Sequence, residues 1–168
     1  MREIDLKVST SIERWGEKSF PRVWRFGAAY ALVWFVIEAA AFLFVMPFRH
    51  WLLFLGAAFA VHAITFMLQL IIRRPRPVHH RSQPYKLWIH TYSFPSAHAS
   101  SSFGCAVLGS VAAFQFIPEA AGFLVTANFI FAAYISFSRV TVGVHYLGDV
   151  IAGSVLGAIT GLLFASLL

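Results

Sequence analysis

The residues best suited to chemistry lie in one polar stretch, Ser138 to Asp149, between two long apolar segments. It contains a cation, Arg139, an imidazole, His145, and a carboxylate, Asp149. Such groups are costly at the mouth of a hydrophobic segment, which favours a functional site. If a helix begins near His145, His145 and Asp149 lie four residues apart on one face. The carboxylate would then hold one imidazole nitrogen and leave the other to act as nucleophile or base. The alternative is a polar helix cap at a membrane surface.

A second polar cluster, Arg73 to Pro77, reads Arg-Arg-Pro-Arg-Pro and follows an apolar run. Its prolines end the helix and force an extended exit, which would hold the Arg76 guanidinium near the membrane surface. A guanidinium is suited to bidentate capture of phosphate. Arginines after a span are also common topology anchors, which is the alternative interpretation.

A third cluster, Phe94 to His98, precedes another apolar run and contains Pro95-Ser96. Pro-Ser is a helix start signal, and a helix N-terminus offers unpaired N–H groups to an anion. Ser96 could add its hydroxyl, and His98 would lie one step inside the helix. The alternative is an ordinary cap with an interfacial histidine.

The elements that must position these clusters are membrane spans. Of the 168 residues, 59% are hydrophobic and only 12% are charged, about half the charge of a soluble domain. We therefore predict an all-α polytopic membrane helix bundle over residues 23–168, preceded by an amphipathic interfacial helix over residues 1–22. A solvated helix packed on the bundle is the alternative for that first segment. Five stretches have spanning length or close to it: 24–46, 50–72, 98–117, 120–137 and 147–168.

With five spans, all three polar clusters emerge on the same side of the membrane. That side carries 12 of the 13 lysines and arginines, and Arg49 lies on the other. The positive-inside rule predicts that the crowded side is cytoplasmic. The arginines of the clusters serve chemistry in our interpretation, so only the six N-terminal charges are independent support.

Several other polar or small residues lie within the spans. Glu38 and His62 fall at similar depth on adjacent helices, where they could pair or line a cavity. Gly153, Gly157 and Gly161 form a small-residue stripe that favours packing inside the bundle, with a homodimer as the weaker possibility. The basic residues form no long stripe or known module, which argues against nucleic acid as a partner. The lone Cys105 suits packing.

Together, Arg76-Pro77, Pro95-Ser96-x-His98 and Ser138-Arg139 with His145 and Asp149 resemble the three-part signature of the type 2 phosphatidic acid phosphatase (PAP2) superfamily. This family includes bacterial lipid phosphate phosphatases. The resemblance covers residues 69 to 149, with Ala97 where glycine is usual. It implies a multi-pass protein, expected in a bacterial inner membrane.

The resemblance also implies a phosphohistidine mechanism without metal or cofactor. His145 would attack phosphorus, Asp149 would orient it, and His98 would protonate the departing alkoxide and later help to activate water. Donors from all three clusters would hold the phosphate oxygens: Arg76, Arg139, Ser96 and the backbone N–H groups near Ala97.

The sequence departs from the family pattern at Gln69, where lysine is usual. Phosphate binding would then be weaker, or helped by Arg73, Arg74 or Lys86. The expected substrates are lipid phosphates: phosphatidic acid, phosphatidylglycerol phosphate, a polyprenyl phosphate or diphosphate, or lipid A phosphate. Two alternatives stay open, a lipid phosphotransferase that uses the same site and a non-catalytic scaffold that binds anionic lipid.

Overall fold

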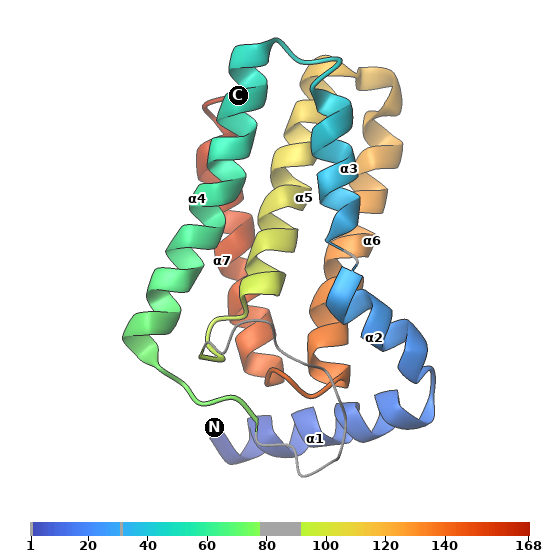
Figure 1. The fold of residues 1–168 in the computed structure, drawn as a ribbon, viewed down its shortest axis with the longest axis vertical. Helices are drawn as coiled ribbons and strands as arrows, with labels where there is room; N and C mark the ends of the chain where they lie inside the picture. The colour runs from blue at the N-terminus through green and yellow to red at the C-terminus, as the bar shows by residue number, and fades with distance from the viewer. Residues whose placement is uncertain (1, 31, 78–91) are drawn as a thin grey trace.

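The computed structural model describes residues 2–30, 32–77 and 92–168, and over these residues the chain is all-α with no strand. Figure 1 shows a bundle with one helix crossing its end. The described residues form seven helices: α1 (Arg2–Lys18), α2 (Pro21–Tyr30), α3 (Val33–Phe42), α4 (Phe48–Ile72), α5 (Ala97–Phe116), α6 (Pro118–Thr141) and α7 (Leu147–Ala165).

Four of the helices, α4 to α7, are long and apolar enough to cross a membrane, and they match the last four expected spans. The first expected span, 24–46, instead comprises two helices, α2 and α3, whose axes differ by 43°. The two helices pack against different neighbours, since α2 contacts α1 and α6 whereas α3 contacts α4 and α5. The boundary expected at residue 22 falls inside α2. The chain is a multi-pass membrane protein, and its described residues contain four candidate spans, or five if α2 and α3 cross as one.

Helix α5 is the centre of the bundle and contacts α3, α4, α6 and α7. Small residues let α7 approach it closely. A Cβ added at Gly153 would lie 2.5 Å from the Ser96 carbonyl oxygen, and one at Gly157 would meet the Ser100 carbonyl oxygen still more closely. The glycine stripe is therefore used for packing inside the bundle, as predicted, and it fixes α7 against α5 at both positions.

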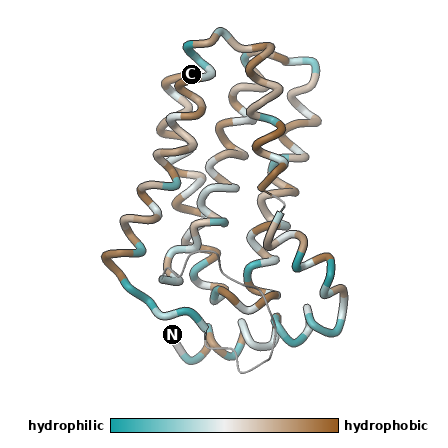
Figure 2. Tube along the Cα trace, viewed as in Figure 1, coloured by the Kyte–Doolittle hydropathy of each residue, from teal (hydrophilic) through white to brown (hydrophobic). Residues whose placement is uncertain are grey.

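The three polar clusters converge at one end of the bundle, as the span count predicted. There α4 ends, α5 begins, α6 ends and α7 begins, and α1 lies across this end (Figure 1). Hydrophilic residues gather on α1 and the neighbouring segments, while the spans are mostly hydrophobic (Figure 2). Helix α1 packs on α6, α7 and α2, yet it leaves Ile4, Val8 and Trp15 exposed.

The two polar residues singled out within the spans do not pair with each other. Glu38 Oε1 accepts a hydrogen bond from Asn128 Nδ2 at 2.7 Å, and Asn128 Oδ1 accepts one from Trp34 Nε1 at 2.7 Å. We call Trp34, Glu38 and Asn128 the membrane cluster. His62 Nδ1 instead lies 2.9 Å from Ser101 Oγ. Of the two alternatives left open for these residues, the pairing of Glu38 with His62 is therefore wrong.

Candidate active site

Backbone contacts join the polar clusters. Helix α4 ends at Ile72, and the left-handed conformation of the next residue, Arg73 (φ 51°), turns the chain away from the helix axis. The next residues pair with the segment before α5, since the Ser93 N–H donates to the Arg74 carbonyl at 2.8 Å. At the start of α5, the Ser96 N–H donates to the Asp149 carbonyl of α7 at 3.0 Å. These links fix the three segments relative to one another.

His145 lies just before α7 and is only 2% exposed. Its Nδ1 lies 2.8 Å from the Ser93 carbonyl oxygen, and its Nε2 lies 2.9 Å from Arg76 Nη1. A carbonyl can only accept and a guanidinium can only donate. The imidazole is therefore neutral, with the proton on Nδ1 and the lone pair on Nε2.

The electrostatics of the site favour the same neutral state. Burial lowers the pKa of His145 to about 4; the Asp149 carboxylate opposes this shift, and Arg139 and Arg76 add to it. An imidazole that stays neutral at physiological pH keeps its Nε2 lone pair available as a nucleophile.

Asp149 is fully buried and accepts from two sides. Its Oδ1 accepts from Arg74 Nη1 at 2.6 Å, and its Oδ2 accepts from the Tyr146 N–H at 3.0 Å. His145 Nδ1 is 3.6 Å from Oδ2, farther than from the Ser93 carbonyl. Sequence reasoning missed Ser93 because it acts through its backbone carbonyl, which leaves no mark on residue type.

Two of the predicted phosphate ligands, Arg76 and Arg139, lie near His145 and come from different elements. Arg76 Nη1 donates to the Val144 carbonyl at 3.1 Å as well as to His145. Arg139 is 1% exposed, and its Nη1 donates to the Ala28 carbonyl of α2 at 2.7 Å. Helix α2 thus helps to hold a cation of the site, a role its own sequence did not indicate.

His98 lies in the first turn of α5 and is half-buried. Arg139, His145, His62 and Arg76 all lie close enough to interact electrostatically with its imidazole. The structure therefore brings His98 together with His145 and with the two arginines that were predicted to bind phosphate, as the sequence predicted for the three clusters.

Ser96 caps α5 and is fully buried, with its Oγ accepting from the Ala99 N–H at 3.5 Å. Ala97 follows as the first residue of α5. Gln69 is 1% exposed, and its Nε2 donates to the Pro95 carbonyl at 2.7 Å, while its Oε1 has no hydrogen-bond partner. The amide at this position thus holds the segment that leads into α5.

The cations named as substitutes for the usual lysine have other roles. Arg73 Nε donates to the Leu70 carbonyl of its own helix at 2.8 Å. Arg74 binds Asp149 and also Asp5, at 2.8 Å between Nη2 and Oδ2, and its guanidinium lies 4.0 Å from the Tyr146 ring centroid. Burial opposes its charge, but Asp5 and Asp149 raise the pKa of Arg74 above its usual range. Lys86 lies outside the described residues.

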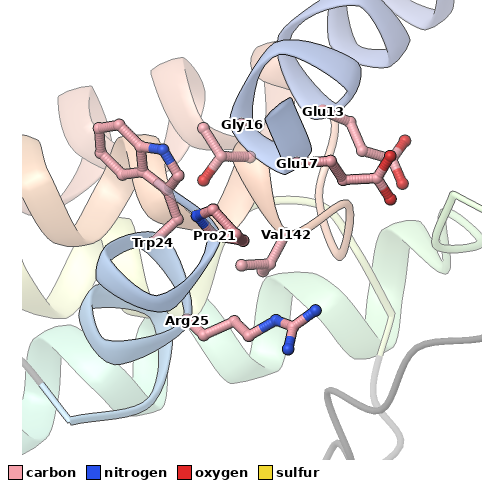
Figure 3. Close-up of a pocket in the computed structure, with 8 residues that line it drawn as sticks. Glu13, Gly16, Glu17, Pro21, Trp24, Arg25 and Val142 are labelled. Carbon is pink, nitrogen blue, oxygen red and sulfur yellow. The ribbon is translucent and has the colours of Figure 1, made fainter. Parts of the chain in front are cut away.

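A separate shallow cleft of about 50 Å³ lies between α1, α2 and the end of α6. Figure 3 shows Glu13 and Glu17 of α1 on one side of it and Arg25 of α2 below. None of the predicted site residues lines this cleft. It is therefore distinct from the candidate active site.

Comparison with known proteins finds matches to the part of the chain that contains the candidate active site. Residues 49–168 match the sequence model of the PAP2 superfamily. The chain is 34% identical over 113 residues to decaprenylphosphoryl-5-phosphoribose phosphatase from Mycobacterium tuberculosis, covering 67% of this chain and 58% of that protein. The protein of that name from Mycolicibacterium smegmatis is 34% identical over 110 residues, 62% of this chain and 53% of its own length. This chain thus spans little more than half of these curated relatives.

Two solved structures have a similar fold. A PAP2-type phosphatidylglycerolphosphate phosphatase from Bacillus subtilis superposes with a TM-score of 0.78 at 22% identity, over 99% of this chain and 85% of the other. Aquifex aeolicus LpxE gives 0.65 at 21% identity, over 96% and 94%. The match to the family model covers most of the chain and contains all three polar clusters. It also contains Gln69, which stands where lysine is usual. The chain belongs to the PAP2 superfamily.

Proposed function

We propose that the protein is a phosphatase that removes phosphate from a membrane lipid through a phosphohistidine on His145. The observation that carries this proposal is the state of the imidazole. Its Nδ1–H is held by the Ser93 carbonyl, and its Nε2 lone pair points toward the Arg76 guanidinium. A neutral nucleophile directed at a cation is arranged to meet an anionic centre.

In the first step, the His145 Nε2 lone pair attacks phosphorus and the bond between phosphorus and the lipid oxygen breaks. His98 takes up a proton when the anionic phosphate binds beside it, and it passes this proton to the leaving alkoxide, which departs as the lipid alcohol. Arg76 and Arg139 stabilise the charge on the equatorial oxygens. Asp149 stabilises the positive imidazole ring of the phosphohistidine.

In the second step, His98, now neutral, takes a proton from water as the oxygen attacks phosphorus. The bond between phosphorus and Nε2 breaks, its electron pair returns to His145 Nε2, and inorganic phosphate leaves. The cycle ends with His145 neutral, and the proton that His98 took up at substrate binding is released as phosphate leaves, so no external reactant besides water is needed.

Arg76 has to change partner for the reaction to begin. Its Nη1 lies 2.9 Å from the nitrogen that attacks phosphorus. A phosphate oxygen would take over this N–H, because a charge-assisted bond to an anion is stronger than one to a neutral imidazole. Substrate binding would thereby release the Nε2 lone pair.

Lipid phosphates are the proposed substrate class because the site lies where four spans begin or end. A lipid tail could stay in the bilayer while its phosphate reaches the arginines. Two relatives at 34% identity are named for a decaprenyl-linked phosphoribose substrate, which favours a polyprenyl-linked phosphate over phosphatidic acid, phosphatidylglycerol phosphate or lipid A phosphate.

The test is phosphate release in detergent from a panel of polyprenyl and glycerolipid phosphates, with chelator present. We expect wild-type protein to release inorganic phosphate, while His145→Ala and His98→Ala do not. His50→Ala is the matched control, since His50 lies at the opposite end of the bundle against Phe116. Full activity in His145→Ala, or activity that chelator removes, would overturn the mechanism.

The same assay separates the alternatives. A phosphorylated acceptor in place of free phosphate would indicate a phosphotransferase. No product from any substrate, with lipid binding that His145→Ala leaves unchanged, would indicate a scaffold.

We place the site on the cytoplasmic side of a bacterial inner membrane. Helix α1 crosses the site end of the bundle (Figure 1), so its basic residues lie on the same side as the site, where the positive-inside rule favours cytoplasm. Labelling of a cysteine introduced at exposed Lys7 with a membrane-impermeant reagent in intact cells would contradict this orientation.

A further inference from the structure

Helix α1 lies outside the region that matches the family, which begins at residue 49. It nevertheless reaches the centre of the candidate active site. Asp5 Oδ2 accepts from Arg74 Nη2 at 2.8 Å, and Arg74 Nη1 donates to Asp149 Oδ1 at 2.6 Å. One guanidinium thus bridges a carboxylate of α1 and the carboxylate beside His145.

The other contacts of Asp5 fix it in place. Its Oδ1 accepts from the Gly148 N–H at 2.9 Å, and Ser9 Oγ, one turn further along α1, accepts from the Leu147 N–H at 2.8 Å. Two of the unpaired N–H groups at the start of α7 are therefore capped by side chains of another helix. A carboxylate there also complements the positive end of α7.

The bridge constrains Arg74 at both ends of its planar fork. The side chains of Arg74 and Asp5 are each 18% exposed, and that of Asp149 is fully buried. The Tyr146 ring covers the guanidinium face at 4.0 Å from its centroid. A guanidinium with this geometry has little freedom, and lysine could not reproduce two directed bonds of this kind.

We propose that Asp5 is a positioning residue of the active site: acting through Arg74, it holds Asp149, and with it His145, in the reacting arrangement. This rests on the proposed function. Asp5 also supplies a second negative charge next to Arg74. Without Asp5, Arg74 would pair with Asp149 alone and would offset more of its negative charge. Asp149 would then stabilise the positive imidazole ring of the phosphohistidine less.

Asp5→Asn tests this role, because the amide keeps an oxygen for the Gly148 N–H but loses the charge. The groups that act on His145 are Asp149, Arg139 and Arg76, together with the nearby His98. Loss of one negative charge from this surrounding lowers the pKa of His145 further. NMR titration of labelled histidine should therefore show His145 protonating at lower pH in Asp5→Asn than in wild type.

In the phosphate-release assay, we expect kcat to fall about tenfold in Asp5→Asn, the effect of losing one hydrogen bond between charged groups, with KM little changed. The loss should largely vanish when Arg74 is already replaced: in an Arg74→Gln background, Asp5→Asn should cost less than about twofold. An equal cost in both backgrounds would overturn the proposal.

Two variants on the same helix serve as controls. Glu3→Gln removes a carboxylate that pairs with Lys7 at the surface, where both side chains are more than 70% exposed (78% and 74%). Ser9→Ala removes a cap of α7 without touching Arg74 and should lower thermal stability only. Neither should shift the titration of His145.

An unchanged His145 titration in Asp5→Asn, or the same shift in Ser9→Ala, would show that Asp5 only docks α1. The titration does not depend on turnover. If wild-type protein releases no phosphate, the proposed function fails, and the titration still decides whether Asp5 acts on His145.

Discussion

Among the described residues, buried polar side chains gather both at the candidate active-site end of the bundle and in the membrane cluster. At the site end, His145 and Asp149 each contact groups from segments more than fifty residues away, including Ser93, Arg74 and Arg76. In the membrane cluster, Glu38 meets one amide and, through it, one indole. His145, Asp149 and Glu38 are each at most 6% exposed, so burial of a polar group does not by itself distinguish a site. The candidate active site is distinguished instead by the opposite charges that converge around the neutral imidazole of His145.

Among the substitutions that test this contrast, replacement of His145 should have the largest effect on phosphate release. His145→Gln keeps hydrogen-bonding capacity but has no nucleophilic ring nitrogen, so phosphate release should fall by roughly 10³-fold or more. The measurement is initial rate in detergent at saturating substrate. A loss of less than tenfold would remove His145 from the nucleophile's role and weaken the distinction between the two regions.

Gly157 tests whether the site end depends on the contact between α7 and α5. Gly157→Ala would press a Cβ against the Ser100 carbonyl, whereas a Cβ at Gly56 meets nothing within 4 Å. We expect Gly157→Ala to lose about 1–3 kcal/mol of stability through overpacking, together with activity, and Gly56→Ala to be neutral or slightly stabilising. Thermal unfolding of both variants in detergent gives the comparison. Equal stabilities would contradict the packing described.

Low pH should reduce the stability of the folded protein through protonation of His145. Its pKa is about 4 in the folded protein and about 6.5 in the unfolded chain. The unfolded chain therefore binds more protons between these values, and stability falls as pH drops from about 6.5 to about 4, by up to about 3 kcal/mol. His145→Gln should lose this part of the acid sensitivity, measured as the change in melting temperature between pH 7 and pH 4.5. A variant as acid-sensitive as wild type would assign the effect to other groups.

Gln69→Lys should have a small effect in the favourable direction. The lysine ammonium can donate to the Pro95 carbonyl as Gln69 does, and the substitution removes the unpartnered Oε1. It also restores a cation near the phosphate ligands, so turnover should stay within about threefold of wild type or rise, with a lower KM. Gln69→Met, which can donate no hydrogen bond, is the control. Complete loss of activity in Gln69→Lys would show that the pocket is arranged differently.

The smallest effect is expected in the membrane cluster. Glu38→Gln keeps an oxygen for Asn128 Nδ2, and Glu38 lies opposite Gly109, about three helical turns along α5 from His98. Phosphate release should therefore stay within about twofold of wild type. A large drop in kcat without loss of stability would mean that the membrane cluster takes part in the reaction, and the two regions would no longer be separate in function.

The sequence by itself determined the all-α class, the last four spans and the meeting of three clusters at one end. Long apolar runs permit little other than helices in a membrane, and the span count sets the side on which each polar segment emerges. Residue type also marked His98, His145, Asp149, Arg76 and Arg139 as candidates, because such groups are rare beside apolar segments. The structure brings these five together at one end of the bundle.

Only the tertiary structure decided which groups contact one another. The Ser93 carbonyl, rather than Asp149, accepts the hydrogen bond from His145 Nδ1–H, Arg74 bridges two carboxylates, and one of these is Asp5 of α1. Backbone carbonyls leave no trace in residue type, and a pair such as Asp5 and Arg74 is separated by 69 residues. Local periodicity describes neighbours three or four residues apart. The packing of α1 across the end of the bundle is a long-range event, and it determines the surroundings of Asp149.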